Sequence, residues 1–207
     1  MQRIKGGLPK SRLESLTDLV FGLALSIGSL SLLAKSPTTP SDVVTAVSGF
    51  AFSFLILITI WFRYTKIMSV LPMETGGTMV LNGIMLFLVS IEPYLLGVLT
   101  SGSFNGSNAA LQNFASQAYA LDLGGLTLIM GLFAHELTTE GRGQLTPELI
   151  GEYRRVRNTE YFVGAWFALS ALPFFWSWEV LGTPARITLW YFALIFAWLS
   201  RLIGKMS

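Results

Sequence analysis

The residues of this sequence that could do chemistry are ionisable side chains inside long apolar stretches. Asp18, Glu92 and Asp122 each lie within such a stretch, and His135 and Glu136 close another. A charge in hydrocarbon is costly and is usually paired, so each of these residues is by default a candidate site for a cation or a proton. The pair His135-Glu136 would lie at a membrane interface, where titration is possible.

Each candidate also has a structural interpretation, and the sequence leaves both open. Asp18 either carries protons or clamps the first apolar segment, with Arg12 as its partner on the same or a neighbouring helix. Glu92, next to Pro93, either attracts cations toward an outer mouth or anchors its helix at the interface or pairs with another subunit. Asp122 faces the same choice.

Three further features belong with these candidates. Trp61 and Asn82 could join an Asp18 network through indole and amide hydrogen bonds. Gly124-Gly125, beside Asp122, is a packing or kink site. The ends of apolar helices often carry long polar side chains that reach the interface, and this is the structural interpretation of His135-Glu136.

The sequence has few residues that could support other kinds of chemistry. The sequence has no cysteine and one histidine, which excludes disulfides and thiolate metal sites and leaves too little for a zinc cluster. It has no phosphate-binding glycine loop and no Ser/His/Asp arrangement. The basic residues form short clusters between apolar runs, unlike a nucleic-acid-binding face. We therefore expect no enzyme activity, no catalytic residue, no metal site, no cofactor and no nucleic-acid partner.

The elements that must position these residues are membrane-spanning helices. With 52% hydrophobic and 13% charged residues, the chain has too little polar surface for a soluble globule. Crossing roughly 30 Å of hydrocarbon takes about 20 mostly apolar residues in a helix. The predicted fold class is an all-α integral membrane protein, a single domain over residues 1–207. Its six spans run approximately over 13–34, 41–62, 78–100, 114–135, 160–179 and 185–203.

The distribution of Lys and Arg predicts the topology. Twelve fall on one side of the predicted spans and only Lys35 and Arg186 on the other. The positive-inside rule then places both termini in the cytoplasm, as an even number of spans requires. The longest connection, around 136–159, is predicted to be a helical hairpin or a short amphipathic helix at the interface. The twelve basic residues are Arg3, Lys5, Lys10, Arg12, Arg63, Lys66, Arg142, Arg154, Arg155, Arg157, Arg201 and Lys205.

The first span differs from the other five because small residues flank an apolar stripe. At about 100° per residue, one stripe contains Leu16, Leu19, Leu23, Ser26, Ile27, Leu30 and Ala34. One flank contains Thr17, Ala24, Gly28 and Ser31, and the other contains Ser15, Gly22 and Ser29. Small residues allow helices to approach closely in membranes, so this helix can pack on both sides. The stripe is either an ordinary packing face or one wall of a pore, formed by identical helices around a shared axis.

Residues 12–27 also carry a resemblance to a known family. The stretch Arg12-Leu-Glu-Ser-Leu-Thr-Asp18-Leu-Val-Phe21-Gly-Leu23-Ala-Leu-Ser26-Ile27 resembles the first-helix signature of prokaryotic transmembrane-protein-175-type channels. That signature is Arg-x-x-x-Phe-Ser-Asp, then Val-Phe-Ala and an aliphatic stretch with Ser or Thr. Leu16 and Thr17 replace the usual Phe and Ser. Trp61, Asn82 and the Pro-Tyr segment at 93–96 extend the resemblance, whereas Arg63-Tyr64 stands where the family often has a His.

The resemblance implies a homotetrameric potassium channel in the cell membrane with four first helices around the pore. Leu23 would be the principal hydrophobic gate, Ile27 and Leu30 further rings, and Ser26 a hydroxyl ring that contributes to selectivity. Arg12, Asp18, Trp61 and Asn82 would hold the pore helix in place. Potassium sheds its hydration shell more easily than sodium, so the channel would prefer potassium. The expected preference is modest compared with that of a carbonyl filter. Without a carbonyl filter or an arginine-rich voltage sensor, the expected current is a voltage-independent leak.

Two alternatives to a potassium channel remain. A proton-conducting or proton-coupled protein would use Asp18, Asp122 or His135, and eukaryotic relatives of the family are thought to pass protons. A non-conducting accessory membrane protein would use the leucine stripe for packing alone.

Overall fold

The computed structural model describes residues 10–32, 38–71, 76–101, 109–140, 145–180 and 183–206, and these are almost entirely helical. The helices are α1 (Lys10–Ser31), α2 (Pro40–Val70), α3 (Gly76–Ser101), α4 (Ala109–Glu140), α5 (Pro147–Ser170), α6 (Phe174–Ser177) and α7 (Ala185–Met206). Two short strands, β1 (Glu179–Val180) and β2 (Thr183–Pro184), pair antiparallel between α6 and α7. The prediction of a helical protein is confirmed.

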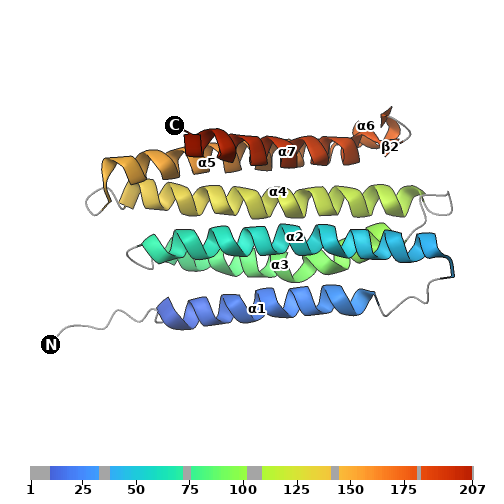
Figure 1. The fold of residues 1–207 in the computed structure, drawn as a ribbon, viewed down its shortest axis with the longest axis horizontal. Helices are drawn as coiled ribbons and strands as arrows, with labels where there is room; N and C mark the ends of the chain where they lie inside the picture. The colour runs from blue at the N-terminus through green and yellow to red at the C-terminus, as the bar shows by residue number, and fades with distance from the viewer. Residues whose placement is uncertain are drawn as a thin grey trace.

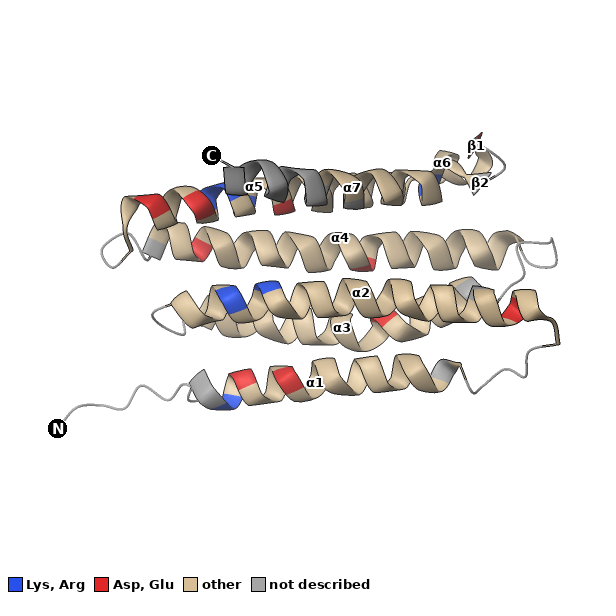
Figure 2. Cartoon of the chain, in the orientation of Figure 1, with Lys and Arg blue, Asp and Glu red and all other residues tan. Residues whose placement is uncertain are grey.

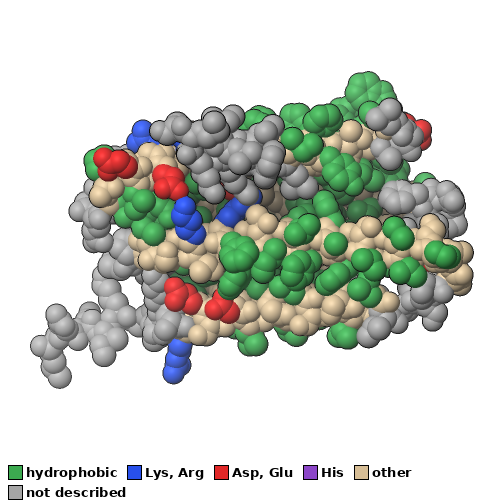
Figure 3. Space-filling view, viewed as in Figure 1, with side chains coloured by type: hydrophobic (Ala, Val, Ile, Leu, Met, Phe, Trp, Pro, Cys, Tyr) green, Lys and Arg blue, Asp and Glu red, His purple; other side chains and the backbone are tan. Residues whose placement is uncertain are grey.

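Four helices among the described residues are long and apolar enough to cross a membrane. The spans are Arg12–Leu30, Pro40–Val70, Gly76–Leu99 and Ala109–Thr139. A helix satisfies its own backbone hydrogen bonds, which hydrocarbon cannot do. Figure 3 shows hydrophobic side chains over the middle of the visible face, and Figure 2 shows most charged positions toward the end of the bundle where α1 begins. The chain is therefore a multi-pass membrane protein.

The long helices lie side by side in layers, with α1 at one edge (Figure 1). α1 packs against α2 and α3, α4 packs against α2, α3 and α5, and α7 packs against α5 at the other edge. In the apolar window of α4, 67% of the residues are buried, against 28% for α1. α4 is the central helix of the chain and α1 a peripheral one.

Glycines allow α4 and α5 to approach closely. A Cβ atom added to Gly131 would lie 2.5 Å from the Tyr161 ring, and one added to Gly124 would lie 3.1 Å from the Gly164 carbonyl oxygen. On the opposite helix, a Cβ at Gly164 would lie 2.6 Å from Leu128. Gly124 is thus a packing position, which is one of the two roles predicted for Gly124-Gly125.

The fifth span is a correction to the sequence prediction. The expected connection at 136–159 and span at 160–179 are replaced by α4 continuing to Glu140 and by α5 over Pro147–Ser170. Thr146 accepts a hydrogen bond from the Leu149 N–H, and Pro147 follows it, so α5 starts early with a cap and a favourable first residue. It ends before Pro173, because a proline disfavours helical backbone at the residue that precedes it.

The second span is also longer than predicted. α2 does not end near residue 62 but continues to Val70, so that Arg63 and Lys66 lie on the helix rather than in a loop. Its start is fixed by a capping box between Thr39 and Asp42, with Pro40 in the first turn. Helices α1, α3 and α7 lie within three residues of the bounds predicted for 13–34, 78–100 and 185–203, whereas α4 extends five residues beyond 114–135 at each end. Of the charges used to predict the topology, Arg3, Lys5, Lys35 and Arg142 lie outside the described residues, as does Ala34 of the stripe.

Candidate functional site

α1 has one face packed in the chain and one face open. Leu13, Thr17, Phe21, Ala24 and Gly28 recur at helical spacing and are buried against α2 and α3. The exposed fractions of the five large stripe residues are high: 46% for Leu16, 68% for Leu19, 57% for Leu23, 46% for Ile27 and 59% for Leu30. An edge helix of a membrane protein thus carries a continuous apolar stripe that its own chain does not cover.

The two small flanks of α1 differ in the same way. On the inner flank, a Cβ at Gly28 would meet the Phe50 ring at 3.5 Å and Pro93 at 3.8 Å. On the outer flank, Ser15, Gly22 and Ser29 are exposed, and no atom lies within 4 Å of a Cβ added to Gly22. One of the two predicted close approaches is therefore made within the chain.

Ser26 lies next to the exposed stripe and is itself exposed. Its hydroxyl donates to the Gly22 carbonyl at 2.8 Å, one turn earlier in the same helix. With the hydrogen directed into the helix, the hydroxyl oxygen keeps lone pairs that can face a cation.

Two groups of hydrogen bonds tie α1 to its neighbours. The Trp61 indole Nε1 donates to Asp18 Oδ1 at 2.8 Å. Asn82, fully buried on α3, donates through its amide to Thr17 Oγ1 at 3.4 Å, and the Tyr64 hydroxyl lies 3.3 Å from the same oxygen. Three of the four residues predicted to anchor α1 thus take part in its contacts, Asp18 and Trp61 in one group and Asn82 in the other.

Two members of these groups, Thr17 and Tyr64, were missed at the level of sequence. The only signal for Thr17 was its place in the first-helix signature, where the family has a Ser. Arg12, the fourth predicted anchor, is exposed, and neither ion pair formed among the described residues includes it. A partner for Arg12 stays a prediction.

Arg63 and Tyr64, which depart from the family pattern, contact different helices. Arg63 uses one guanidinium nitrogen to reach both carboxylate oxygens of the buried Glu160 on α5, at 2.6 and 2.7 Å. Tyr64, the next residue, points to Thr17 on α1. Lys66 adds an exposed ion pair to Glu152 on α5 at 2.7 Å.

Glu92 is a correction. It is fully buried, and its carboxylate accepts hydrogen bonds from Ser53 Oγ on α2 at 2.5 Å and from the Tyr119 hydroxyl on α4 at 2.9 Å. A side chain enclosed by three helices cannot present its charge at an outer mouth, so the predicted attraction of cations there is wrong. The partners of Glu92 belong to its own chain.

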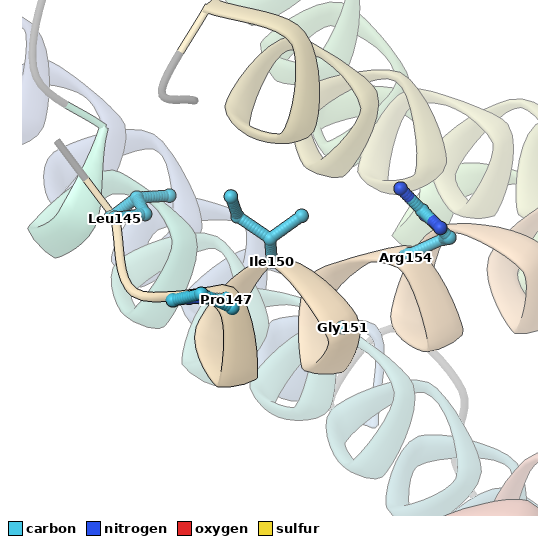
Figure 4. A pocket seen from close by; sticks show the side chains of 5 residues that line it. All are labelled: Leu145, Pro147, Ile150, Gly151 and Arg154. Atoms are coloured by element: carbon cyan, nitrogen blue, oxygen red, sulfur yellow. The ribbon is translucent and has the colours of Figure 1, made fainter. Parts of the chain in front are cut away.

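Two other ionisable candidates lie elsewhere in the chain. Asp122 is only 3% exposed, and neither carboxyl oxygen has a hydrogen-bond partner among the described residues. His135 lies near the end of α4, with Nδ1 3.4 Å from an Arg157 guanidinium nitrogen on α5. An open hollow lies at the start of α5 and is lined by Leu145, Pro147, Ile150, Gly151 and Arg154 (Figure 4).

Comparisons with known proteins agree with the resemblance in the first helix. Residues 12–93 match the family model of the endosomal/lysosomal potassium channel TMEM175. No curated protein matches the chain. A lysosomal potassium-selective channel TMEM175 homolog from Chamaesiphon minutus has the same fold, with a TM-score of 0.68, 18% identity and coverage of 92% of this chain and 97% of that one.

A second solved structure has the fold as well. It is a variant of the potassium channel MtTMEM175 in complex with a nanobody–MBP fusion protein, with a TM-score of 0.67, 18% identity and coverage of 100% of this chain and 97% of that one. The family is one of ion channels rather than of enzymes. Residues 12–93 of this chain thus match the TMEM175 potassium channel family, and the chain has the fold of two solved channels of that name.

Proposed function

We propose that the protein is a homotetrameric, potassium-selective leak channel with four α1 helices around its pore. The observation that carries this proposal is the exposed stripe of Leu16, Leu19, Leu23, Ile27 and Leu30 on an edge helix. A second copy of α1 packs on the open flank of Ser15, Gly22 and Ser29, and repetition around an axis closes a ring. The partners are then three further copies of the chain, membrane lipid and potassium.

In this arrangement the stripe supplies the gate. Leu23 forms the principal ring, and Ile27 and Leu30, one and two turns along the same face, form further rings. A narrow apolar ring excludes water and blocks ions until it widens. Ser26 contributes a ring of hydroxyl oxygens beside the gate.

Selectivity then follows from dehydration. An ion at the apolar rings sheds part of its water with few polar groups to replace it, and potassium loses water more easily than sodium. The resulting preference is modest. The predicted absence of a voltage-sensing helix makes the current independent of voltage.

The network around Asp18 and Asn82 holds α1 against the rest of its subunit. Trp61 ties α2 to Asp18, and Asn82 ties α3 to Thr17. Arg12 completes the network through a contact with Asp18 of a neighbouring subunit. These contacts fix the rotation of α1 and thus the direction of the gate residues.

The membrane topology we propose has six spans in one domain over residues 1–207, with both termini in the cytoplasm. The apolar half of α5 and the helix α7 complete the set of four apolar helices. The clustering of charge at one end of the bundle supports this orientation (Figure 2). The membrane is the cell membrane.

Potassium flux into proteoliposomes tests the proposal. Leu23→Ser should raise the flux several-fold and admit more sodium, because a hydroxyl ring no longer repels water. Leu169→Ser is the matched control, since Leu169 is an equally exposed leucine (58%) on α5 at the far edge of the chain; its flux should equal that of the unmodified protein.

Three results would contradict the proposal. Equal flux from both variants would move the constriction away from Leu23. A reversal potential that follows the pH gradient instead of the potassium gradient would favour a proton-conducting protein. A strict monomer in the membrane could not bring several α1 helices to one axis and would favour a non-conducting accessory protein.

A further inference from the structure

A second group of ionisable residues lies inside the bundle, away from the exposed face of α1. Its centre is Glu92 on α3, which accepts hydrogen bonds from Ser53 on α2 and from Tyr119 on α4. The Tyr119 ring packs against Trp190 of α7, with 5.4 Å between the ring centroids. Three helices thus enclose this carboxyl group, and α7 packs against one of its hydrogen-bond donors.

Asp122 shares the environment of Glu92. It follows Tyr119 by three residues on α4, and residues at this spacing lie on the same helix face. Asp122 thus lies on the face of α4 from which the Tyr119 hydroxyl donates to Glu92. Buried apolar residues adjoin both acids along their helices, with Val89 and Leu96 around Glu92 and Leu126 after Asp122.

The two acids have unequal partners. Both oxygens of Glu92 accept a hydroxyl donor, as an ionised carboxylate requires. Neither oxygen of Asp122 has a donor among the described residues, although 97% of its surface is buried. An unpaired buried carboxylate is far more costly than a neutral acid, and two adjacent carboxylates repel each other as well.

The remaining charge near the pair is Arg186, fully buried at the start of α7. It reaches α4 at Ser116, one turn before Tyr119, at 2.5 Å. Its other donors are directed to Asn113 and to the last carbonyls of α5. No carboxylate pairs with it among the described residues, so Arg186 neutralises neither acid through an ion pair.

We propose that Glu92 and Asp122 form a buried proton-binding site in which Glu92 is ionised and Asp122 carries the proton. The ligand is a proton rather than a metal ion, because Glu92 already accepts two hydroxyl donors and only one further acid is at hand. No group of three or more metal-ligating side chains exists among the described residues. Binding forms one O–H bond on Asp122, and release returns the proton to water. The site is independent of the proposed pore and of subunit number.

Infrared spectroscopy of the protein in lipid tests this directly, since a protonated acid and a carboxylate absorb at different frequencies. At neutral pH the unmodified protein should show a carboxylic-acid band that shifts in heavy water. Asp122→Asn should abolish the band, because the amide copies the shape of the acid without its proton. Glu92→Gln should retain it. Glu148→Gln, at an exposed acid on α5, is the control and should leave it unchanged.

A second measurement separates loss of the proton from misfolding of a variant. The folded protein holds a proton that the unfolded chain releases, so its melting temperature in detergent should fall as pH rises from 5 to 8. Asp122→Asn should flatten that fall. Absence of the band at neutral pH, its loss with Glu92→Gln alone, or an unchanged pH slope in Asp122→Asn would each overturn the assignment.

Discussion

Arg186 illustrates, at the scale of one residue, how this bundle accommodates a buried charge. Its guanidinium donates to Ser170, Ala171 and Leu172, whose carbonyls have no partner within α5 because the helix ends there. The partial negative charge at a helix C-terminus also favours a cation. Position and hydrogen bonds together therefore replace the missing carboxylate partner, and Asp122 has no comparable compensation.

The contact between Trp61 and Asp18 predicts a measurable coupling. Trp61→Phe and Asp18→Asn should each lower the free energy of unfolding, and the double variant should lose about 1 kcal/mol less than the sum, because both changes remove the same hydrogen bond. Thermal or denaturant unfolding in detergent measures this. Trp178→Phe, at an exposed indole between α6 and β1, is the control and should not couple with Asp18→Asn.

Additive losses from Trp61→Phe and Asp18→Asn would mean that the two residues act separately.

The sequence could identify Asp18, Trp61 and Asn82 because each is a polar side chain in an apolar stretch. Thr17 and Tyr64 gave no such signal. A threonine can bond to its own helix, as Thr17 does to Leu13, and a tyrosine is common in any core, so only the packing of three helices reveals their contact.

At the scale of elements, the flanks of α1 separate folding from assembly. Gly22→Leu meets no atom within the chain, so the subunit should keep its melting temperature, yet the bulky side chain should block a neighbouring α1 and shift tetramers toward smaller species. Native mass spectrometry or crosslinking in lipid measures the change. Gly83→Leu on α3, where the added side chain is equally free, is the control.

Normal tetramers from Gly22→Leu would contradict the proposed subunit contact. The search for apolar stretches of about 20 residues, which predicted the six spans, gave a wrong position for the fifth. Residues 147–159 carry charges and residues 171–178 are mostly apolar, so hydropathy moved the predicted helix toward the aromatic segment. The signals that set its true ends are local: Thr146-Pro147 at the start and Pro173 after the end.

At the scale of the whole molecule, the topology predicts which residues face the outside. Because the chain has no cysteine, single cysteines can be introduced and labelled without background. In intact cells, a membrane-impermeant maleimide should label Glu179→Cys in β1 and spare Glu148→Cys at the start of α5. Both variants should react after the membrane is permeabilised. Labelling of Glu148→Cys in intact cells would reverse the orientation.

The adjacent residues Arg63 and Tyr64 make α2 a mechanical link across the subunit. Arg63 pairs with Glu160 on α5 and Tyr64 contacts Thr17 on α1, so we expect a rotation of α2 about its own axis to change both contacts together. A movement of the charged half of α5 would then reach α1 through two adjacent residues of α2.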